Sequence, residues 1–224
     1  MKKLEIACFN LESALIASKS NADRIEFCAD ASSGGITPPL EEIEILRAST
    51  EKEIVIMIRP RGGDFYYSDK EFEQMKTEIN AIKNLHVDGF VFGILDKNNE
   101  IDFNRNQELI ELTKPYPCTF HRAFDRTSDA LTSLEKVIDL GFKTILTSGL
   151  RNNVDEGKYT LKTLVEKATG QITIMPGGGL RSTNINEIDH VTEAEYFHSS
   201  AMINSEIADL NEINLLKNLI NSQQ

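Results

Sequence analysis

The sequence has few cysteines, and it lacks an apolar stretch long enough to cross a membrane. Its three cysteines, Cys8, Cys28 and Cys118, are an odd number at unrelated spacings, which indicates reduced thiols rather than a disulfide framework. No apolar run approaches the roughly 20 residues that span a bilayer. Glu5 and Glu12 interrupt the apolar stretch that a secretory signal would need. We therefore expect a cytoplasmic protein.

Positive charge is also scarce. The chain has 24 lysines and arginines against 35 aspartates and glutamates, a formal net charge of −11 over 224 residues. This balance argues against nucleic acid or an anionic membrane as the main partner. With 40% hydrophobic residues, the composition is that of a globular protein with a sizeable core.

Several local signatures of enzymes are missing. The chain contains no GxSxG, HExxH, CxxC or P-loop motif. The histidines never fall at i, i+2 or i, i+4, so no local zinc site is encoded. No lysine stands at the carboxyl end of a predicted strand, so a Schiff-base aldolase is not expected.

Short β-rich runs alternate with helical patterns along the whole chain. Strands are predicted over 4–9, 24–29, 53–59, 89–95, 118–124, 144–149, 172–177 and 195–200. Helices are predicted over 11–20, 39–48, 69–85, 104–113, 129–140, 154–168, 182–189 and 211–221. Asn10 is expected to cap the first of these helices, and Ser68 with Glu71 has capping-box spacing.

Eight strands, each followed by a helix, predict an α/β fold of the (β/α)8 TIM-barrel type. A doubly wound open sheet is the alternative, although it would need an unusually wide sheet and no GxGxxG follows the first strand. No linker, low-complexity block or strong internal repeat divides the chain. We therefore expect a single domain over 1–224, with 221–224 as a frayed end.

Charged residues inside these strands point to a site. A glutamate in an apolar strand is costly unless it is paired, so we place Glu5 and Glu26 inside the barrel on adjacent strands. His121 and His198 stand near the ends of the fifth and eighth strands. A closed salt-bridge network is the structural alternative, but buried ion pairs add little net stability. Converging titratable groups therefore indicate a functional site.

The stretch VIMIRPRGGDFYYS (55–68) ends an apolar run in two arginines. Arg59 and Arg61 share strand parity on either side of Pro60, so both would face one ligand if the extended backbone persists. Guanidinium groups bind carboxylates and phosphates in a planar, bidentate way. We predict an anion clamp here, with Asp64 as a partner of either arginine.

The stretch MPGGGLRS (175–182) supplies three consecutive glycines after the seventh strand. In many barrels a phosphate lies between the loops after strands seven and eight. We therefore expect Gly177, Gly178 and Gly179 to bind an anion together with His198 and Ser199. The alternative is a tight turn that merely needs glycine.

Eight segments, in order along nearly the whole chain, carry a family resemblance. They are NADRIEFC (21–28), GGITP (34–38), MIRPRGGDFYYSD (57–69), VFGIL (91–95), TFHRAFD (119–125), ILTSG (145–149), PGGG (176–179) and EYFHSSA (195–201). With them the chain resembles the CutC family, named for copper homeostasis. The resemblance implies a cytoplasmic, often dimeric, single-domain barrel that binds Cu(I) through cysteines near the ends of the first two strands.

Cys28 stands at the family's second-strand cysteine, so the resemblance makes it the candidate Cu(I) ligand. On the first strand, Ala7 occupies the position where relatives often carry cysteine, and Cys8 follows one residue later. A one-residue offset turns a side chain to the opposite face of a strand. Cys8 is therefore expected to face the helices rather than Cys28.

Two functions remain open at this stage. The family name implies a copper-handling homodimer. The residues favour a cofactor-independent enzyme that carries out isomerase-, epimerase- or lyase-type proton transfer on a small anionic or phosphorylated metabolite. In that enzyme Glu5 or Glu26 would be the base, His121 the acid and Asp125 an orienting group. The expected partner is thus a small anionic ligand or a copper ion, and no organic cofactor is expected.

Overall fold

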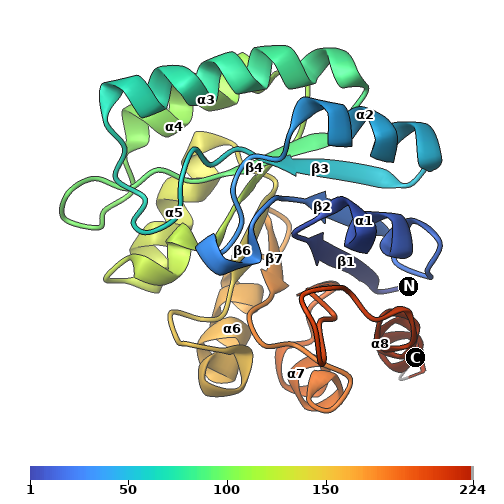
Figure 1. The fold of residues 1–224 in the computed structure, drawn as a ribbon. Helices are drawn as coiled ribbons and strands as arrows, with labels where there is room; N and C mark the ends of the chain where they lie inside the picture. The colour runs from blue at the N-terminus through green and yellow to red at the C-terminus, as the bar shows by residue number, and fades with distance from the viewer. Residues whose placement is uncertain (223–224) are drawn as a thin grey trace.

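Eight parallel strands form one sheet that curves into a nearly closed barrel (Figure 1). The computed structural model describes residues 1–222. The strands are β1 (Lys3–Cys8), β2 (Arg24–Phe27), β3 (Glu53–Met57), β4 (Gly89–Phe92), β5 (Cys118–Phe120), β6 (Thr144–Thr147), β7 (Thr173–Pro176) and β8 (Tyr196–Ser199). Their order is β7-β6-β5-β4-β3-β2-β1-β8. Since β7 also lies beside β8, the barrel prediction is confirmed and the open sheet is wrong.

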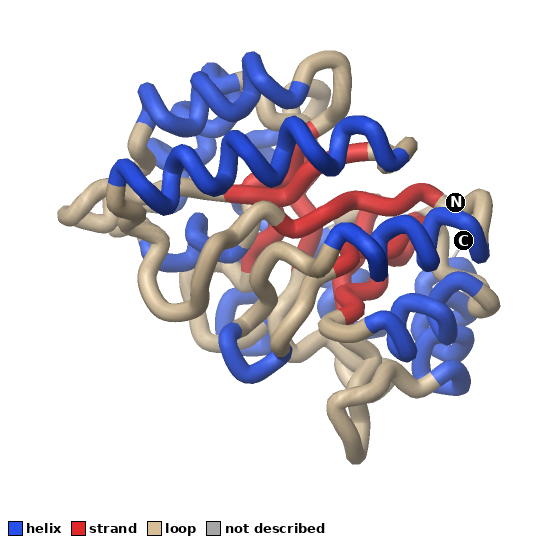
Figure 2. The backbone as a smooth tube through the Cα atoms, turned by 45° about the horizontal axis from the view of Figure 1, so that its top comes forward, coloured by secondary structure: helices blue, strands red, loops and turns tan. Residues whose placement is uncertain are grey.

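Helices surround the strands on the outside (Figure 2). They are α1 (Leu11–Ser18), α2 (Leu40–Ser49), α3 (Asp69–Ile82), α4 (Phe103–Thr113), α5 (Ala130–Leu140), α6 (Val154–Ala168), α7 (Ile185–Thr192) and α8 (Leu210–Asn221). Three short 3-10 helices are η1 (Ala31–Ser33), η2 (Lys83–Leu85) and η3 (Arg122–Arg126). Within residues 1–222, no helix is long and apolar enough to cross a membrane.

The two faces of the sheet are packed differently. Outward-facing residues such as Ile6, Ile25 and Ile54 join the large core shared with the helices. Inward-facing residues form small clusters, one of them built from Cys28, Val55, Met57 and Val91. The interior of the barrel therefore holds less apolar packing than usual, and the space between the clusters is occupied by charged side chains.

Local capping explains why the helices begin where they do. Oδ1 of Asn10 accepts a hydrogen bond of 2.8 Å from the N–H of Ser13, and Ser68 and Glu71 form the predicted capping box at the start of α3. Helix α7 was predicted over 182–189 but begins at Ile185. A turn precedes it because Asn184 Oδ1 accepts from the N–H of Arg181 at 2.8 Å. This turn holds Arg181 at the carboxyl end of the barrel.

Two strands end earlier than the sequence indicated, and this changes the direction of the residues that follow. Strand β3 stops at Met57, before Arg59, and β5 stops at Phe120. The His121 side chain then accepts from the N–H of Ala123 and caps η3. Strand alternation therefore does not extend to Arg59 or His121, which belong to the loops at the rim.

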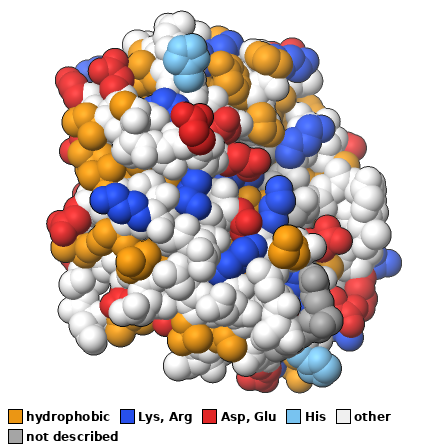
Figure 3. All heavy atoms as spheres, turned by 90° about the vertical axis from the view of Figure 1, so that its right-hand side faces the viewer, with side chains coloured by type: hydrophobic (Ala, Val, Ile, Leu, Met, Phe, Trp, Pro, Cys, Tyr) orange, Lys and Arg blue, Asp and Glu red, His pale blue; other side chains and the backbone are white. Residues whose placement is uncertain are grey.

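The N-terminus and the end of α8 lie on the same side of the molecule (Figures 1 and 2). Of the predicted frayed end 221–224, Asn221 is the last residue of α8 and Ser222 is its C-cap, whereas 223–224 lie outside the described residues. Figure 3 views this side and shows acidic and basic side chains interspersed over it. The site described next lies at the other end of the barrel, where the strands finish.

Candidate functional site

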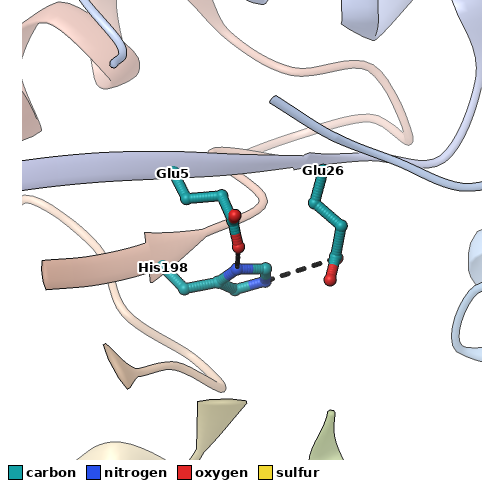
Figure 4. Close-up of side chains that lie close together, drawn as sticks. All are labelled: Glu5, Glu26 and His198. Carbon is teal, nitrogen blue, oxygen red and sulfur yellow. Dashed lines mark hydrogen bonds and ion pairs between the residues drawn. The ribbon is translucent and has the colours of Figure 1, made fainter. Parts of the chain in front are cut away.

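Three buried side chains from neighbouring strands meet inside the barrel (Figure 4). Glu5 lies on β1, Glu26 on β2 and His198 on β8, and β1 pairs with both of the other strands. Nδ1 of His198 is 2.7 Å from Oε1 of Glu5, and its Nε2 is 3.8 Å from Oε2 of Glu26. The imidazole therefore bridges two carboxylates.

Arg24 fixes the charge state of this network. It stands opposite Glu5 in the β1–β2 register, its Nε donates to Oε2 of Glu5, and its guanidinium lies 4.6 Å from the centroid of the Tyr196 ring. Burial would raise the pKa of Glu5, but Arg24 and His198 outweigh it and lower this pKa to about 2. Burial opposes protonation of His198, yet Glu26 and Glu5 raise its pKa. Glu5 is thus an anion that holds His198 in place.

Glu26, unlike Glu5, is a carboxyl group that can gain and lose a proton near neutral pH. Its side chain is 2% exposed, and its Oε1 has no hydrogen-bond partner among the described residues. Burial raises the pKa of Glu26 to about 7, with a further contribution from Glu5 and an opposing one from His198. A carboxyl group that titrates near neutral pH can both accept and donate a proton.

The raised pKa of Glu26 predicts a pH-dependent stability. The folded protein binds this proton more tightly than the unfolded chain, so the stabilisation is complete below pH 4.5 and is lost as the pH rises through about 7. The difference corresponds to about 3 kcal/mol. The free energy of unfolding, measured with urea, should fall between pH 4.5 and pH 8 in the wild type. This fall should exceed the one in Glu26→Gln by the same amount. Equal pH dependence in the two proteins would contradict the assignment.

Glu26 and His198 line a cavity of about 240 Å³ at the carboxyl ends of the strands. Its titratable lining residues are Glu26, Arg59, His121, Arg122, Arg181 and His198. Phe9, Phe65 and Met57 supply apolar wall. A larger cavity of about 550 Å³ lies at the amino ends of β7 and β8, but none of the predicted site residues lines it. The smaller cavity is therefore the candidate site.

His121 is a neutral wall residue of this cavity. Its Nδ1 accepts from the N–H of Ala123 at 3.3 Å, which places the ring proton on Nε2. Nε2 is buried and unpartnered within residues 1–222, and the ring packs 4.8 Å from that of Phe65. Burial, with a contribution from Arg59, lowers the pKa of His121 to about 3. The group is therefore a neutral hydrogen-bond donor at neutral pH.

The two arginines of the expected clamp separate in the structure. Arg59 lines the cavity, but its guanidinium donates to the carbonyls of Ser33, Gly35 and Gly63 at 2.7–3.0 Å. Arg61 is not a lining residue of the cavity. It pairs with Asp64 at 2.9 Å and with Glu71 at 2.6 Å. The shared-parity prediction is wrong because β3 ends at Met57 and the backbone turns between the arginines.

Asp125 acts through its neighbours rather than in the cavity. Its carboxylate accepts from Nε of Arg122 at 2.8 Å and from the N–H of Ser148 at 3.0 Å. Arg122 in turn lines the cavity and donates to Oγ of Ser148 at 2.7 Å. Asp125 therefore orients Arg122 at the end of β5.

The glycines after β7 permit close approach. A Cβ on Gly177 would lie 2.4 Å from Leu146 Cδ1 and 3.0 Å from His198 Cβ, so only glycine fits beside these side chains. Gly178 and Gly179 have φ values of +107° and +76° and line the cavity together with Ser199. Of the three predicted glycines, Gly178 and Gly179 thus lie at the cavity wall, whereas Gly177 is not a lining residue and donates its N–H to the Thr147 carbonyl at 3.0 Å.

The cysteines lie on different faces of the sheet. Cys28 belongs to the interior cluster, and its Sγ is 3.5 Å from Oε2 of Glu26, whereas Cys8 belongs to the outer core. Burial raises the pKa of both thiols. The one-residue offset in the sequence therefore separates the two sulfurs, as its parity indicates.

Glu5, Glu26 and His198 also have the composition of a metal site. Each offers a ligand atom, and these atoms lie within 4.8 Å of one another. Two carboxylates and an imidazole suit a divalent cation such as Zn²⁺ or Mn²⁺ better than Cu(I), which prefers thiolates. Here Glu5 is already neutralised by Arg24 and His198, so the cluster is an ion-pair network.

Sequence reasoning missed three arginines of the site, Arg24, Arg122 and Arg181. Arg122 and Arg181 follow the fifth and seventh strands closely in FHRAFD and GGGLRS, and both line the cavity. Arg59 was selected because it is a charged residue at the carboxyl end of a strand. The same criterion would have selected Arg122 and Arg181. Arg24 needs the strand register, because its partner Glu5 lies on another strand.

The fold and the site together define a (β/α)8-barrel protein with a small cavity, lined by charged residues, at the carboxyl ends of its strands. A model of the CutC family matches residues 2–203. The human "Copper homeostasis protein cutC homolog" is 42% identical over 198 residues, which cover 88% of this chain and 72% of the human protein. A CutC protein of Parabacteroides distasonis is 43% identical over 203 residues, 90% of this chain and 84% of that protein. The chain therefore belongs to the CutC family, and the resemblance is confirmed.

Solved structures agree with this assignment. A putative copper homeostasis protein CutC from Streptococcus agalactiae has a TM-score of 0.84 at 33% identity, covering 89% of this chain and 99% of that one. Phosphoribosyl anthranilate isomerase from Thermotoga maritima has a TM-score of 0.67 at 13% identity, covering 99% of this chain and 100% of that one. This second similarity shows the barrel fold alone.

Proposed function

We propose that this CutC-family protein is a cofactor-independent enzyme that moves a proton on a small anionic metabolite. The supporting observation is Glu26, a buried carboxyl group with one unpartnered oxygen, which lines the cavity and titrates near pH 7. A group used only for packing or pairing would have both oxygens bonded. Glu26 is therefore the proposed acid/base residue.

The proposed reaction starts with the carboxylate form of Glu26. It removes a proton from a hydroxyl-bearing carbon next to a carbonyl group, and the C–H electron pair forms a C=C bond while the carbonyl pair moves to oxygen. Protonated Glu26 returns the proton to the neighbouring carbon while a second proton moves between the two oxygens. These steps complete an isomerisation with no oxidant or reductant.

Two histidines have distinct roles in this proposal. His121 would donate from Nε2 to the developing oxyanion, because its neutral ring lines the cavity and its Nε2 has no partner among the described residues. His198, held by Glu5 at 2.7 Å, places positive charge 3.8 Å from Glu26. This charge favours the carboxylate form and keeps the pKa of Glu26 from rising further.

Solvent exchange tests the proposal even while the substrate is unidentified. The full chain is incubated in D2O with a mixture of hydroxy-carbonyl metabolites, both phosphorylated and unphosphorylated, and analysed by mass spectrometry. Proton transfer at carbon should add one deuterium to a metabolite in the presence of the wild type. The same gain of deuterium with Glu26→Gln, or with no protein, would contradict the proposal.

Cu(I) binding at Cys28 is the second candidate function. It is favoured by the position of Cys28 inside the barrel, 3.5 Å from the Glu26 carboxylate, and by the copper-homeostasis names of curated relatives. Burial raises the pKa of this thiol, so binding would require release of a tightly held proton.

The copper candidate predicts a specific loss of affinity. Cys28→Ser should weaken Cu(I) binding at least tenfold in competition with a Cu(I) chelator. Cys118→Ser is the matched control, because Cys118 is also buried but its Sγ lies 3.0 Å from Thr113 Oγ1, away from the cavity. Unchanged affinity in Cys28→Ser, or equal losses in both variants, would remove this candidate.

A further inference from the structure

We propose that the cavity binds a phosphate monoester, with the phosphoryl group between Arg122 and Arg181 against Gly178 and Gly179. This inference rests on the proposed function in one respect. The carbon skeleton of the ester would extend toward Glu26, which lines the same cavity. The cradle itself stands on separate residues, because none of the four takes part in the Glu5–His198 network.

Arg122 presents a fixed, partly unused guanidinium. Asp125 and Ser148 hold its Nε and Nη2 at 2.8 Å and 2.7 Å, whereas Nη1 donates no hydrogen bond to any acceptor in residues 1–222. A Cβ on Gly178 would lie 2.9 Å from Cζ and 3.0 Å from Nη1. The guanidinium therefore lies directly over the glycine backbone, with one edge free for an anion.

Arg181 supplies a second positive charge from the loop after β7. Its Nη1 donates to Oγ of Ser199 at 3.2 Å, and its Nη2 donates to Oγ of Ser200 at 3.1 Å. Both serines also line the cavity. The Ser199 hydroxyl donates to the carbonyl of Leu180 at 2.7 Å, so Ser199 serves to hold Arg181. Ser200 Oγ accepts from Arg181, and its hydroxyl hydrogen can therefore turn toward an anion. Arg181 and the two serines thus form a hydrogen-bonding wall at the carboxyl ends of β7 and β8.

The glycine backbone between the arginines is open. In the part of the chain that the structure describes, neither the Gly178 nor the Gly179 N–H donates to a protein acceptor. Their carbonyls, by contrast, accept from Val154 and Asn184. Positive φ values at both glycines give the backbone a shape that other residues rarely adopt. Open amides beside two guanidinium groups are typical of a phosphate cradle.

The donor count distinguishes phosphate from a carboxylate. Two guanidinium groups, two amides and the Ser200 hydroxyl exceed the capacity of a two-oxygen carboxylate but match the three terminal oxygens and double charge of a phosphate monoester. They also concentrate positive charge in a chain with a net charge of −11. A cavity of about 240 Å³ suits an ester with a small carbon skeleton.

Two-dimensional ¹H–¹⁵N NMR of the wild type with inorganic phosphate tests the cradle. The Gly178 and Gly179 amides should show the largest shifts, and acetate at the same concentration should bind at least tenfold more weakly. Shifts confined to other residues, or equal binding of acetate, would overturn the proposal. This experiment needs no variant and so does not depend on how a variant folds.

Variants of Arg122 and Arg181 test whether their positive charges bind the phosphate. Arg122→Met and Arg181→Met should each weaken phosphate binding at least tenfold, and Arg181→Lys, which keeps the charge, should weaken it less. Arg126→Met is the matched control, since Arg126 is exposed in the neighbouring groove and outside the cavity, and should change affinity less than twofold. Equal losses in Arg126→Met and Arg181→Met would mean general attraction rather than a cradle.

The cradle and the proposed enzyme can fail separately. Glu26→Gln should bind phosphate at least as tightly as the wild type, because Glu26 is not a cradle residue and the substitution removes a negative charge from the same cavity. Phosphate shifts at Gly178 and Gly179 without deuterium exchange would overturn the proposed function alone. Deuterium exchange without these shifts would overturn the cradle alone.

Discussion

Replacing Glu5 with alanine is expected to lower the free energy of unfolding by about 3–5 kcal/mol. Glu5 is fully buried between Arg24 and His198. Its removal leaves the buried guanidinium of Arg24 without a counter-charge, and desolvation of that charge is no longer compensated. Urea unfolding at pH 7 measures the loss directly.

A double variant separates the lost pairing from the lost volume. Glu5→Leu with Arg24→Met replaces the ion pair by apolar side chains and should recover most of the stability lost by Glu5→Ala. His198 would then lack its Nδ1 partner, so recovery of stability is not expected to restore exchange activity. A loss below about 1 kcal/mol for Glu5→Ala would show that Glu5 is not the buried partner of Arg24.

Glu26→Gln is expected to lower the rate of solvent deuterium exchange by about 10²–10⁴-fold, the usual contribution of a positioned acid or base. Glutamine keeps the shape of the side chain but cannot accept the proton. Since the charged form of Glu26 is costly to bury, the variant should be at least as stable as the wild type at pH 8. Rate and stability should therefore change in opposite directions.

Two further variants control this result. Glu44→Gln makes the same substitution on the exposed face of α2, and it should leave the exchange rate within twofold. Glu26→Asp keeps the carboxyl group but withdraws it by one methylene, so the expected rate lies between those of the wild type and Glu26→Gln. A similar loss in Glu44→Gln and Glu26→Gln would rule out a specific role for Glu26.

The barrel could be predicted from the sequence because its signals are local. Runs such as EIVIM (53–57) and GFVF (89–92) are buried along their whole length apart from Glu53, and helix caps separate them at regular intervals. The interior position of Glu5 and Glu26 followed from the same alternation, since both are almost fully buried. The period of two along a strand is a reliable guide while the backbone stays extended.

The prediction failed where the backbone leaves the strand. Arg61 shares parity with Arg59 in the sequence, but a turn after Met57 directs it to Asp64 and Glu71 at the start of α3. The pairing of Arg24 with Glu5 could not be predicted either. It depends on the register between β1 and β2, and parity alone does not fix which residues stand opposite one another.

A ¹³C NMR titration of the Glu26 side-chain carboxyl, assigned by comparison with Glu26→Gln, tests the proposed acid/base role most directly. The expected midpoint is a pKa of about 7, well above the ordinary value of 4.5 for a glutamate. A carboxyl group with this midpoint exists in both protonation states at neutral pH, as proton transfer requires. A midpoint at or below 4.5 would mean that Glu26 is a permanent anion, and it would contradict the proposed function.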